Sequence, residues 1–163
     1  IFRPRRRLWL ARLRPPARRF AQNAQRLASL GVCAPKVIEH FWLDHRAAIS
    51  ACFYEPLPGT SLDKQFHHQR ESFEASLPDL AAFIRSLHQQ GIYFRSLHLG
   101  NILRLPDGRF GLIDFLDLRI KRAPLSSMLA HRNLKHLQGY LARAKIKDFP
   151  WLRLMQLYAD QRP

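Results

Sequence analysis

The sequence is short of acidic residues and long apolar runs, and each shortage excludes a class of protein. It holds 12 aspartates and glutamates against 27 lysines and arginines, for a net charge of +15. No apolar run reaches the roughly 18 residues of a membrane-spanning helix. Arginines flank the apolar piece 8–10, which is unlike the core of a signal peptide. We therefore expect a cytoplasmic protein, at most peripheral on the cytoplasmic face of the inner membrane.

Cysteine is also scarce, since Cys33 and Cys52 are the only two. Their separation fits no zinc motif, and we interpret both as small buried apolar side chains in a reducing compartment. A chain of 163 residues with 47% hydrophobic content is long enough to bury a core. These features together predict a globular protein.

The positive charge is concentrated near the start of the sequence. Residues 1–38 contain ten lysines and arginines and no acidic residue before Glu39. Apolar side chains alternate with these arginines, as in segments that lie at a membrane surface; they are Phe2, Leu8, Trp9, Leu10 and Leu13. We expect a surface for phosphates of a lipid, nucleotide or nucleic acid, with a merely solvated basic face as the alternative. Nucleic acid is the weaker partner because no nucleic-acid-binding motif accompanies the charge.

The order of elements along the chain predicts an α+β fold. Helical spacing of apolar residues predicts helices over 17–30, 77–90, 126–143 and 149–160. β-rich runs predict one hairpin from 37–43 and 48–55 and another from 102–105 and 109–115. Residues 60–76 are polar and are expected to form a linker. Ser76 and Asp79 have the spacing of a capping box at the start of helix 77–90.

Asn101 and Asp114 stand 13 positions apart around the second predicted hairpin. In phosphoryl-transfer sites an Asn and a later Asp hold Mg²⁺ against nucleotide phosphates, and an Asp five residues before the Asn accepts the proton of the attacking hydroxyl. That third position is Ser96 here. Because a serine hydroxyl is a poor base near neutral pH, the pattern indicates a phosphotransferase that lacks one working part.

On a longer stretch the sequence resembles the lipopolysaccharide kinase family, the Kdo and heptose kinases, and especially its small relatives, the toluene tolerance proteins. The resemblance covers about residues 17–140 and is carried by 54–59, 93–101, 112–114 and 132–134. It implies a protein-kinase-like fold with a truncated N-lobe over 1–58 and a mainly helical C-lobe over 59–163. It also implies ATP and Mg²⁺ as cofactors and, as acceptor, the lipopolysaccharide core or another lipid-linked sugar of the bacterial envelope.

The resemblance assigns roles to individual residues. Glu55 and Leu57 match the hinge whose backbone binds adenine, and Asn101 and Asp114 match the metal ligands. Arg95 matches the arginine before the proton-accepting Asp, at which Ser96 stands.

The departures from the family pattern are equally specific. Leu116 replaces the glycine of the Asp-Phe-Gly motif, and the glycine-rich loop, the nucleotide-binding lysine and its glutamate partner are missing. Ile1 and Phe2 resemble the end of the strand that carries this lysine, so we expect the lysine shortly before Ile1. Asp117 and His98 are the candidates for a substitute base, although an Asx turn at Asp117 and a packing or phosphate-facing role for His98 are the simpler readings.

Three hypotheses follow from the sequence. The first is an impaired kinase or pseudokinase that binds nucleotide and a lipid-linked sugar phosphate. The second is an active ATP-dependent sugar kinase, a transferase with a substitute base. The third is a basic module that binds anionic lipid or nucleic acid and makes no use of nucleotide.

Overall fold

The computed structural model describes residues 1–3 and 8–160. Its helices are α1 (Leu8–Leu13), α2 (Pro16–Ser29), α3 (Leu62–His68), α4 (Arg70–Ala75), α5 (Leu77–Gln89), α6 (Ser127–Arg143) and α7 (Trp151–Asp160), with a 3₁₀ turn η1 (Leu99–Asn101). Its strands are β1 (Lys36–Asp44), β2 (Ile49–Glu55), β3 (Thr60–Ser61), β4 (Ile92–Phe94), β5 (Ile102–Arg104), β6 (Phe110–Leu112) and β7 (Leu118–Ile120). The fold is α+β, as predicted.

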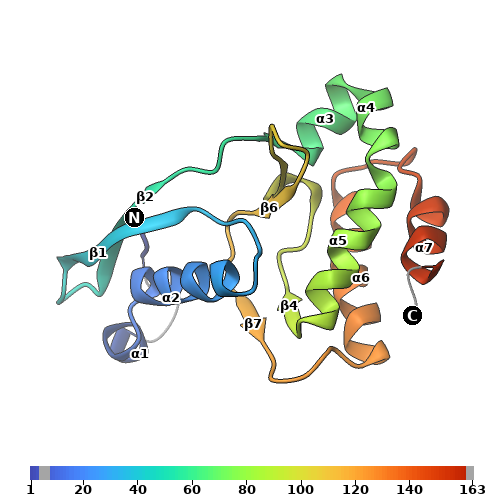
Figure 1. Cartoon of the computed structure of the whole chain (residues 1–163). Helices are drawn as coiled ribbons and strands as arrows, with labels where there is room; N and C mark the ends of the chain where they lie inside the picture. Colours follow the sequence, from blue (N-terminus) through green and yellow to red (C-terminus); the bar gives the residue numbers. More distant parts are fainter. Residues whose placement is uncertain (4–7, 161–163) are drawn as a thin grey trace.

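One end of the molecule is built from α1, α2 and the antiparallel β1–β2 hairpin (Figure 1). The hairpin and helix α2 were both predicted from sequence. Phe2 adds a bridge at the edge of β2, with hydrogen bonds to Ser50 in both directions. Arg5, Arg6 and Arg7, part of the predicted basic segment, lie outside the described residues.

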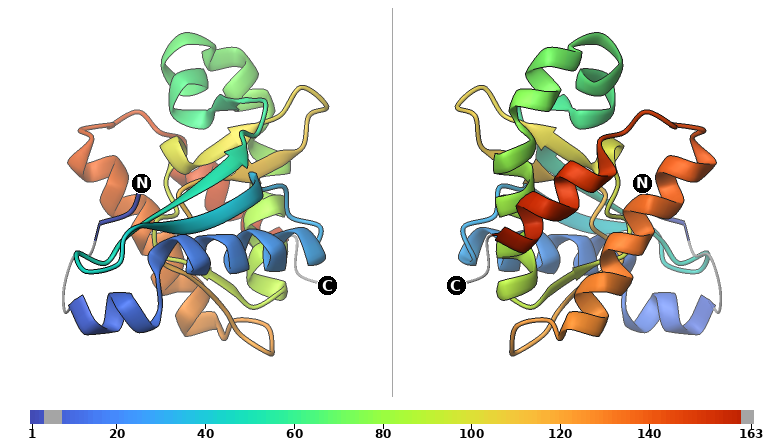
Figure 2. Two further views of the ribbon diagram at one scale, coloured as in Figure 1. Left: turned by 90° about the vertical axis from the view of Figure 1, so that its left-hand side faces the viewer. Right: turned by 90° about the vertical axis from the view of Figure 1, so that its right-hand side faces the viewer.

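The other end is mainly helical, with α5 at its centre. Figure 2 shows α7 on the outer side of α5, and α6 runs past β4. The small sheets β3–β5–β6 and β4–β7 lie between the two ends. Buried side chains from both ends form one core, in which Phe73, Phe94 and Phe115 are the largest fully buried residues. Among the described residues, no helix is long and apolar enough to cross a membrane.

Residues 60–76 are not a linker, and this prediction was wrong. They form β3, α3 and α4. Ser61 caps α3 by accepting a hydrogen bond from the Lys64 backbone, and Leu62 and Phe66, four positions apart on one helix face, are buried. So few large apolar residues in a polar segment show no recognisable period, although Leu62, Phe66 and Phe73 are all buried.

The predicted capping box at Ser76 and Asp79 is also absent. The Ser76 hydroxyl donates a hydrogen bond backward to the carbonyl of Phe73 at 2.8 Å, and Asp79 pairs with Arg104 at 3.3 Å. Helix α4 ends at Ala75, directly before Ser76, so the serine hydroxyl serves the end of one helix and not the start of the next.

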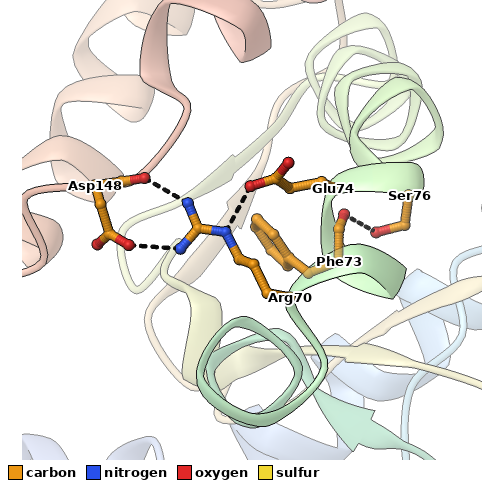
Figure 3. A network of polar contacts seen from close by, with 5 residues as sticks. All are labelled: Arg70, Phe73, Glu74, Ser76 and Asp148. Carbon is orange, nitrogen blue, oxygen red and sulfur yellow. Dashed lines mark hydrogen bonds and ion pairs between the residues drawn. The ribbon is translucent and has the colours of Figure 1, made fainter.

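Arg70 ties α4 to the segment that precedes α7. Its guanidinium donates hydrogen bonds of 2.6 Å to Glu74 and to both the side chain and the carbonyl of Asp148 (Figure 3). The same group lies 4.3 Å from the centre of the Phe66 ring. The hydrogen bond from Arg70 lowers the pKa of Asp148. This contact holds the connection between α6 and α7 against the top of the helical end.

His88 is buried in α5 with a partner on each ring nitrogen. Asn133 donates its amide to the carbonyl of Phe94 at 2.6 Å, which turns its Oδ1 toward Nε2 of His88 at 3.1 Å. Nε2 therefore carries the proton, and Nδ1 accepts a hydrogen bond from the Tyr158 hydroxyl at 2.7 Å. Burial lowers the pKa of His88 from 6.5 to about 4. The ring is thus neutral and links α5, α6 and α7.

This burial predicts a loss of stability in mild acid. The unfolded chain binds a proton at His88 below about pH 6.5, whereas the folded chain binds it only near pH 4, so the stabilising contribution is complete above pH 6.5 and lost toward pH 4. The loss should reach on the order of 3 kcal/mol. Urea unfolding at pH 7 and pH 4.5 checks it, and His88→Gln should reduce the difference between the two values. The same pH dependence in the variant would assign the effect to other groups.

Candidate functional site

The β5–β6 hairpin sets the positions of Asn101 and Asp114. Ile102 pairs with Leu112, and the ladder continues by one hydrogen bond, from the Ile113 N–H to the carbonyl of Asn101 at 3.0 Å. Asn101 directly precedes β5 and faces Ile113, and Asp114 directly follows Ile113, so the two residues lie at the same end of the hairpin. The sequence prediction that the hairpin brings them together agrees with this register.

The predicted strand 109–115 included Asp114, but in the structure Asp114 lies outside the strand. Strand β6 ends at Leu112, and Asp114 adopts a left-handed backbone conformation with φ of 51°. This conformation is costly for a residue with a Cβ, and such residues gather at functional sites. The Asp114 side chain is exposed. The turn therefore ends the ladder and presents the carboxylate to solvent.

Ser96 and Asn101 belong to one tight loop after β4. The Asn101 amide donates to the carbonyl of Ser96 at 3.1 Å, and the Asn101 N–H donates to the carbonyl of His98 at 2.9 Å. Asn101 is buried, and within the described chain its side-chain oxygen Oδ1 accepts no hydrogen bond. This oxygen remains available as a ligand.

The side-chain oxygen of Asn101 and the carboxylate of Asp114 are the kinds of ligand that suit a magnesium ion bound together with a nucleotide. Mg²⁺ prefers hard oxygen ligands and is commonly held by one or two protein groups plus phosphates and water. Over residues 1–3 and 8–160 there is no group of three or more histidines, cysteines or acidic residues that could hold a metal by itself. Asn101 and Asp114 can therefore supply two ligands, and the phosphates of a nucleotide would have to complete the site.

Helix α2 holds the segment that follows Asp114. The rings of Phe20 and Phe115 stack with centroids 4.4 Å apart, and the Asn23 amide donates to the carbonyl of Phe115 at 3.0 Å. Arg19 forms an ion pair with Asp117 at 3.4 Å. Asp117, a candidate substitute base, thus has one carboxylate oxygen engaged by α2, and the turn at this point is closed by a backbone bond from Leu118 to Phe115.

The proposed hinge residues lie at the end of β2. Glu55 is exposed and pairs with Lys36 at 3.3 Å. Leu57 is half-buried and lies against Gly111, where a Cβ would come within 3.1 Å of both the Leu57 side chain and the Cys33 carbonyl. A side chain larger than glycine would push these neighbours apart by a few tenths of an ångström. The hinge segment is therefore packed directly on β6 of the Asn101–Asp114 hairpin.

His98 is surrounded by residues that the sequence did not indicate. Its ring stacks on Tyr140 with centroids 4.6 Å apart, and the Tyr140 hydroxyl donates to Asp63 at 2.6 Å. Burial and the bond to Asp63 raise the pKa of Tyr140 to about 12. Burial lowers the pKa of His98, an effect opposed by the charges of Asp114 and Asp63. Its Nδ1 is buried and has no hydrogen-bond partner in the part of the chain that the structure describes.

Arg95, the remaining candidate, is exposed and points to a different set of neighbours. Burial and, next, the charge of Arg95 lower the pKa of His136 on α6. Arg95 also lines a cavity together with other basic residues near β7 and α6. The structure thus groups Ser96, Asn101, Asp114 and the unpredicted His98 cluster, while Asp117 faces α2 and Arg95 faces α6.

Comparison with solved structures finds proteins of similar fold. Two structures of the bifunctional kinase-methyltransferase WbdD are similar to this chain. One, a medium-resolution structure, has a TM-score of 0.52 and 18% identity over 89% of this chain, and the other, of monomeric WbdD, has a TM-score of 0.50 and 16% identity over 90%. The chain spans 35% and 37% of the length of the two WbdD chains. No protein-family model matches the sequence, and no curated protein matches it.

Proposed function

We propose that this chain is a kinase-like protein of lipopolysaccharide metabolism that binds Mg²⁺-ATP at Asn101 and Asp114 and transfers phosphate slowly or not at all. The observation that carries the proposal is the β5–β6 register, which brings the backbones of Asn101 and Asp114 to the same end of one hairpin. The kinase-like fold supports it. In this proposal the hinge residues 55–57 bind the adenine, and the bound ion neutralises phosphate charge.

Ser96 is the reason for proposing impaired transfer. It occupies the place from which a carboxylate would accept the proton of the attacking hydroxyl, and the described residues offer only Asp117 and His98 nearby in sequence. Asp117 is engaged by Arg19, and the His98 ring is stacked on Tyr140. The sequence resemblance to lipopolysaccharide kinases and toluene tolerance proteins suggests a lipid-linked sugar of the envelope as the ligand. An active sugar kinase using His98 or Asp117 as base is the competing proposal.

Calorimetric titration of the protein with ATP tests nucleotide binding. Binding should require Mg²⁺, since the phosphates reach Asn101 and Asp114 through the ion. Equal ATP affinity with Mg²⁺ and with EDTA would contradict the proposed site. Complete absence of ATP binding would leave the basic module as the better function.

A second function, binding to an anionic membrane surface, is favoured by α1. This short helix exposes Leu8, Trp9, Leu10 and Leu13, of which Leu13 is 69% exposed. Arg12 and Arg14 lie beside them and are exposed as well. Apolar side chains mixed with arginines suit the boundary between lipid headgroups and acyl chains.

Sedimentation with lipid vesicles tests this surface. The protein should bind vesicles that contain phosphatidylglycerol and should be released as salt rises, because exposed charges are screened beyond about 10 Å at 0.1 M salt. Replacing Arg14 and the exposed Arg18, which line one pocket together with Leu13, by glutamine should weaken binding roughly 30-fold, at about 1 kcal/mol for each arginine near the surface. The control is the same double charge change at Arg122 and Arg153. Equal binding to neutral phosphatidylcholine vesicles would contradict the proposal.

A further inference from the structure

A small cavity lies where β4, β7 and α6 meet, apart from the Asn101–Asp114 site. Strands β4 and β7 are antiparallel, with Tyr93 opposite Arg119, and α6 packs against β4 (Figure 1). The cavity has a volume of about 260 Å³. We call it the basic pocket and define it by Arg95, Arg119, Lys121, Arg132, Tyr93 and His136, which line it.

Regular backbone geometry brings these cations to one place. Arg119 lies in β7, and Lys121 directly follows the strand with its N–H bonded to the Gly91 carbonyl at 2.9 Å. Two positions apart in an extended segment, the two side chains lie on the same face. Arg132 and His136 are four positions apart on α6 and so lie on the same face of the helix. Arg95 directly follows β4. Four permanent positive charges from three elements therefore converge on a space of a few hundred cubic ångströms.

No carboxylate offsets this charge. Arg70, Arg104 and Arg109 each pair with an aspartate or glutamate, whereas the ion pairs of residues 1–3 and 8–160 include none of the four cations of the basic pocket. No acidic residue lines the cavity. Like charges that line one cavity repel one another, and a bound anion would reduce that repulsion.

The basic pocket also contains two neutral side chains that can form hydrogen bonds with a ligand. The Tyr93 hydroxyl and His136 Nε2 are 2.9 Å apart. Burial, together with the nearby arginines, lowers the pKa of His136, so its ring is neutral near pH 7. The arginines and the lysine can donate to phosphate oxygens. The Tyr93 hydroxyl and the His136 ring can exchange hydrogen bonds with hydroxyl groups that the phosphate carries.

We propose that the basic pocket binds a phosphate monoester. Arginine forks and lysine are the donors that phosphate oxygens prefer. The cavity is smaller than the roughly 300–1,000 Å³ of sites for drug-sized ligands, which favours a phosphate with a single sugar or glycerol unit over a whole nucleotide. The inference does not depend on the proposed kinase-like function, because it needs neither Mg²⁺ nor Asp114.

Calorimetry in EDTA at physiological salt tests the pocket with two probes, glucose 6-phosphate and dihexanoyl phosphatidic acid. At least one should bind, and the tighter of the two identifies the source of the phosphate as a sugar or a lipid headgroup. Arg119→Gln and Arg132→Gln should each weaken binding about 10- to 100-fold, the usual effect of losing a hydrogen bond to a charged group. Arg119→Lys, which keeps the charge, should weaken it less.

The control is Arg122→Gln, which removes an exposed positive charge next to Lys121, outside the cavity lining. It should leave binding unchanged. Circular dichroism confirms that each variant is folded. Binding of neither probe, or equal losses in Arg119→Gln and Arg122→Gln, would overturn the proposal, because the second result would mean attraction by diffuse surface charge alone.

Discussion

Asp114→Ala should remove Mg²⁺-dependent ATP binding, with a loss of affinity on the order of 100-fold or more, about 3 kcal/mol. The physical reason is that Asp114 supplies the only carboxylate of the proposed pair, and the Asn101 oxygen alone carries no net charge to hold a divalent ion. Titration with ATP at fixed Mg²⁺ measures the effect.

Two further variants make this experiment specific. Alanine is less favourable than aspartate at a φ of 51°, so Asp114→Ala could weaken the turn itself. Asp114→Asn removes the charge, and asparagine tolerates the left-handed conformation, so it should lose binding without loss of fold. Asp107→Ala is the matched control, since Asp107 lies in the turn of the same hairpin and pairs with Arg109. Full Mg²⁺-ATP affinity in Asp114→Asn would refute the metal site.

Ser96→Asp should raise phosphate transfer to a lipopolysaccharide core acceptor by about 10² to 10⁴, the usual contribution of a positioned base. The loop can accept this change without losing a contact. Its hydrogen bond to the Asn101 amide comes from the Ser96 backbone carbonyl, and the half-buried Ser96 hydroxyl takes part in no hydrogen bond of the described residues. Transfer from radiolabelled ATP measures the rate.

Ser96→Asn is the matched control, because it has nearly the same size as aspartate and cannot accept the proton at neutral pH. Adding Asp114→Ala to Ser96→Asp should abolish the gain. Native turnover at ordinary kinase rates, about 1 to 100 per second, would refute impaired transfer. His98→Gln and Asp117→Asn would then identify the base.

The proximity of Asn101 and Asp114 could be predicted because it is a local property. Both residues flank one short hairpin, and the turn signal 106–108 sets its register. The left-handed backbone of Asp114 could not be predicted, since aspartate seldom adopts it and nothing in the local sequence required strand β6 to end at Leu112.

The surroundings of His98 and Arg95 were beyond sequence reasoning. Tyr140 and Asp63 are 77 positions apart, and the basic pocket joins β4, β7 and α6. Strands of three residues, such as β4 and β7, carry too few side chains to show a period. Their pairing exists because the core around Phe94 and Leu118 brings them together.

The sequence by itself determined the α+β class, the excess of positive charge, and the placement of Asn101 and Asp114 around one hairpin with serine at position 96. Those features depend on composition and on neighbours within about one hairpin. The tertiary structure decided that α2 engages Asp117, that His98 stacks on Tyr140, and that four cations converge without a carboxylate. Each of these depends on which buried faces pack together, and packing joins residues whose separation in the sequence carries no signal.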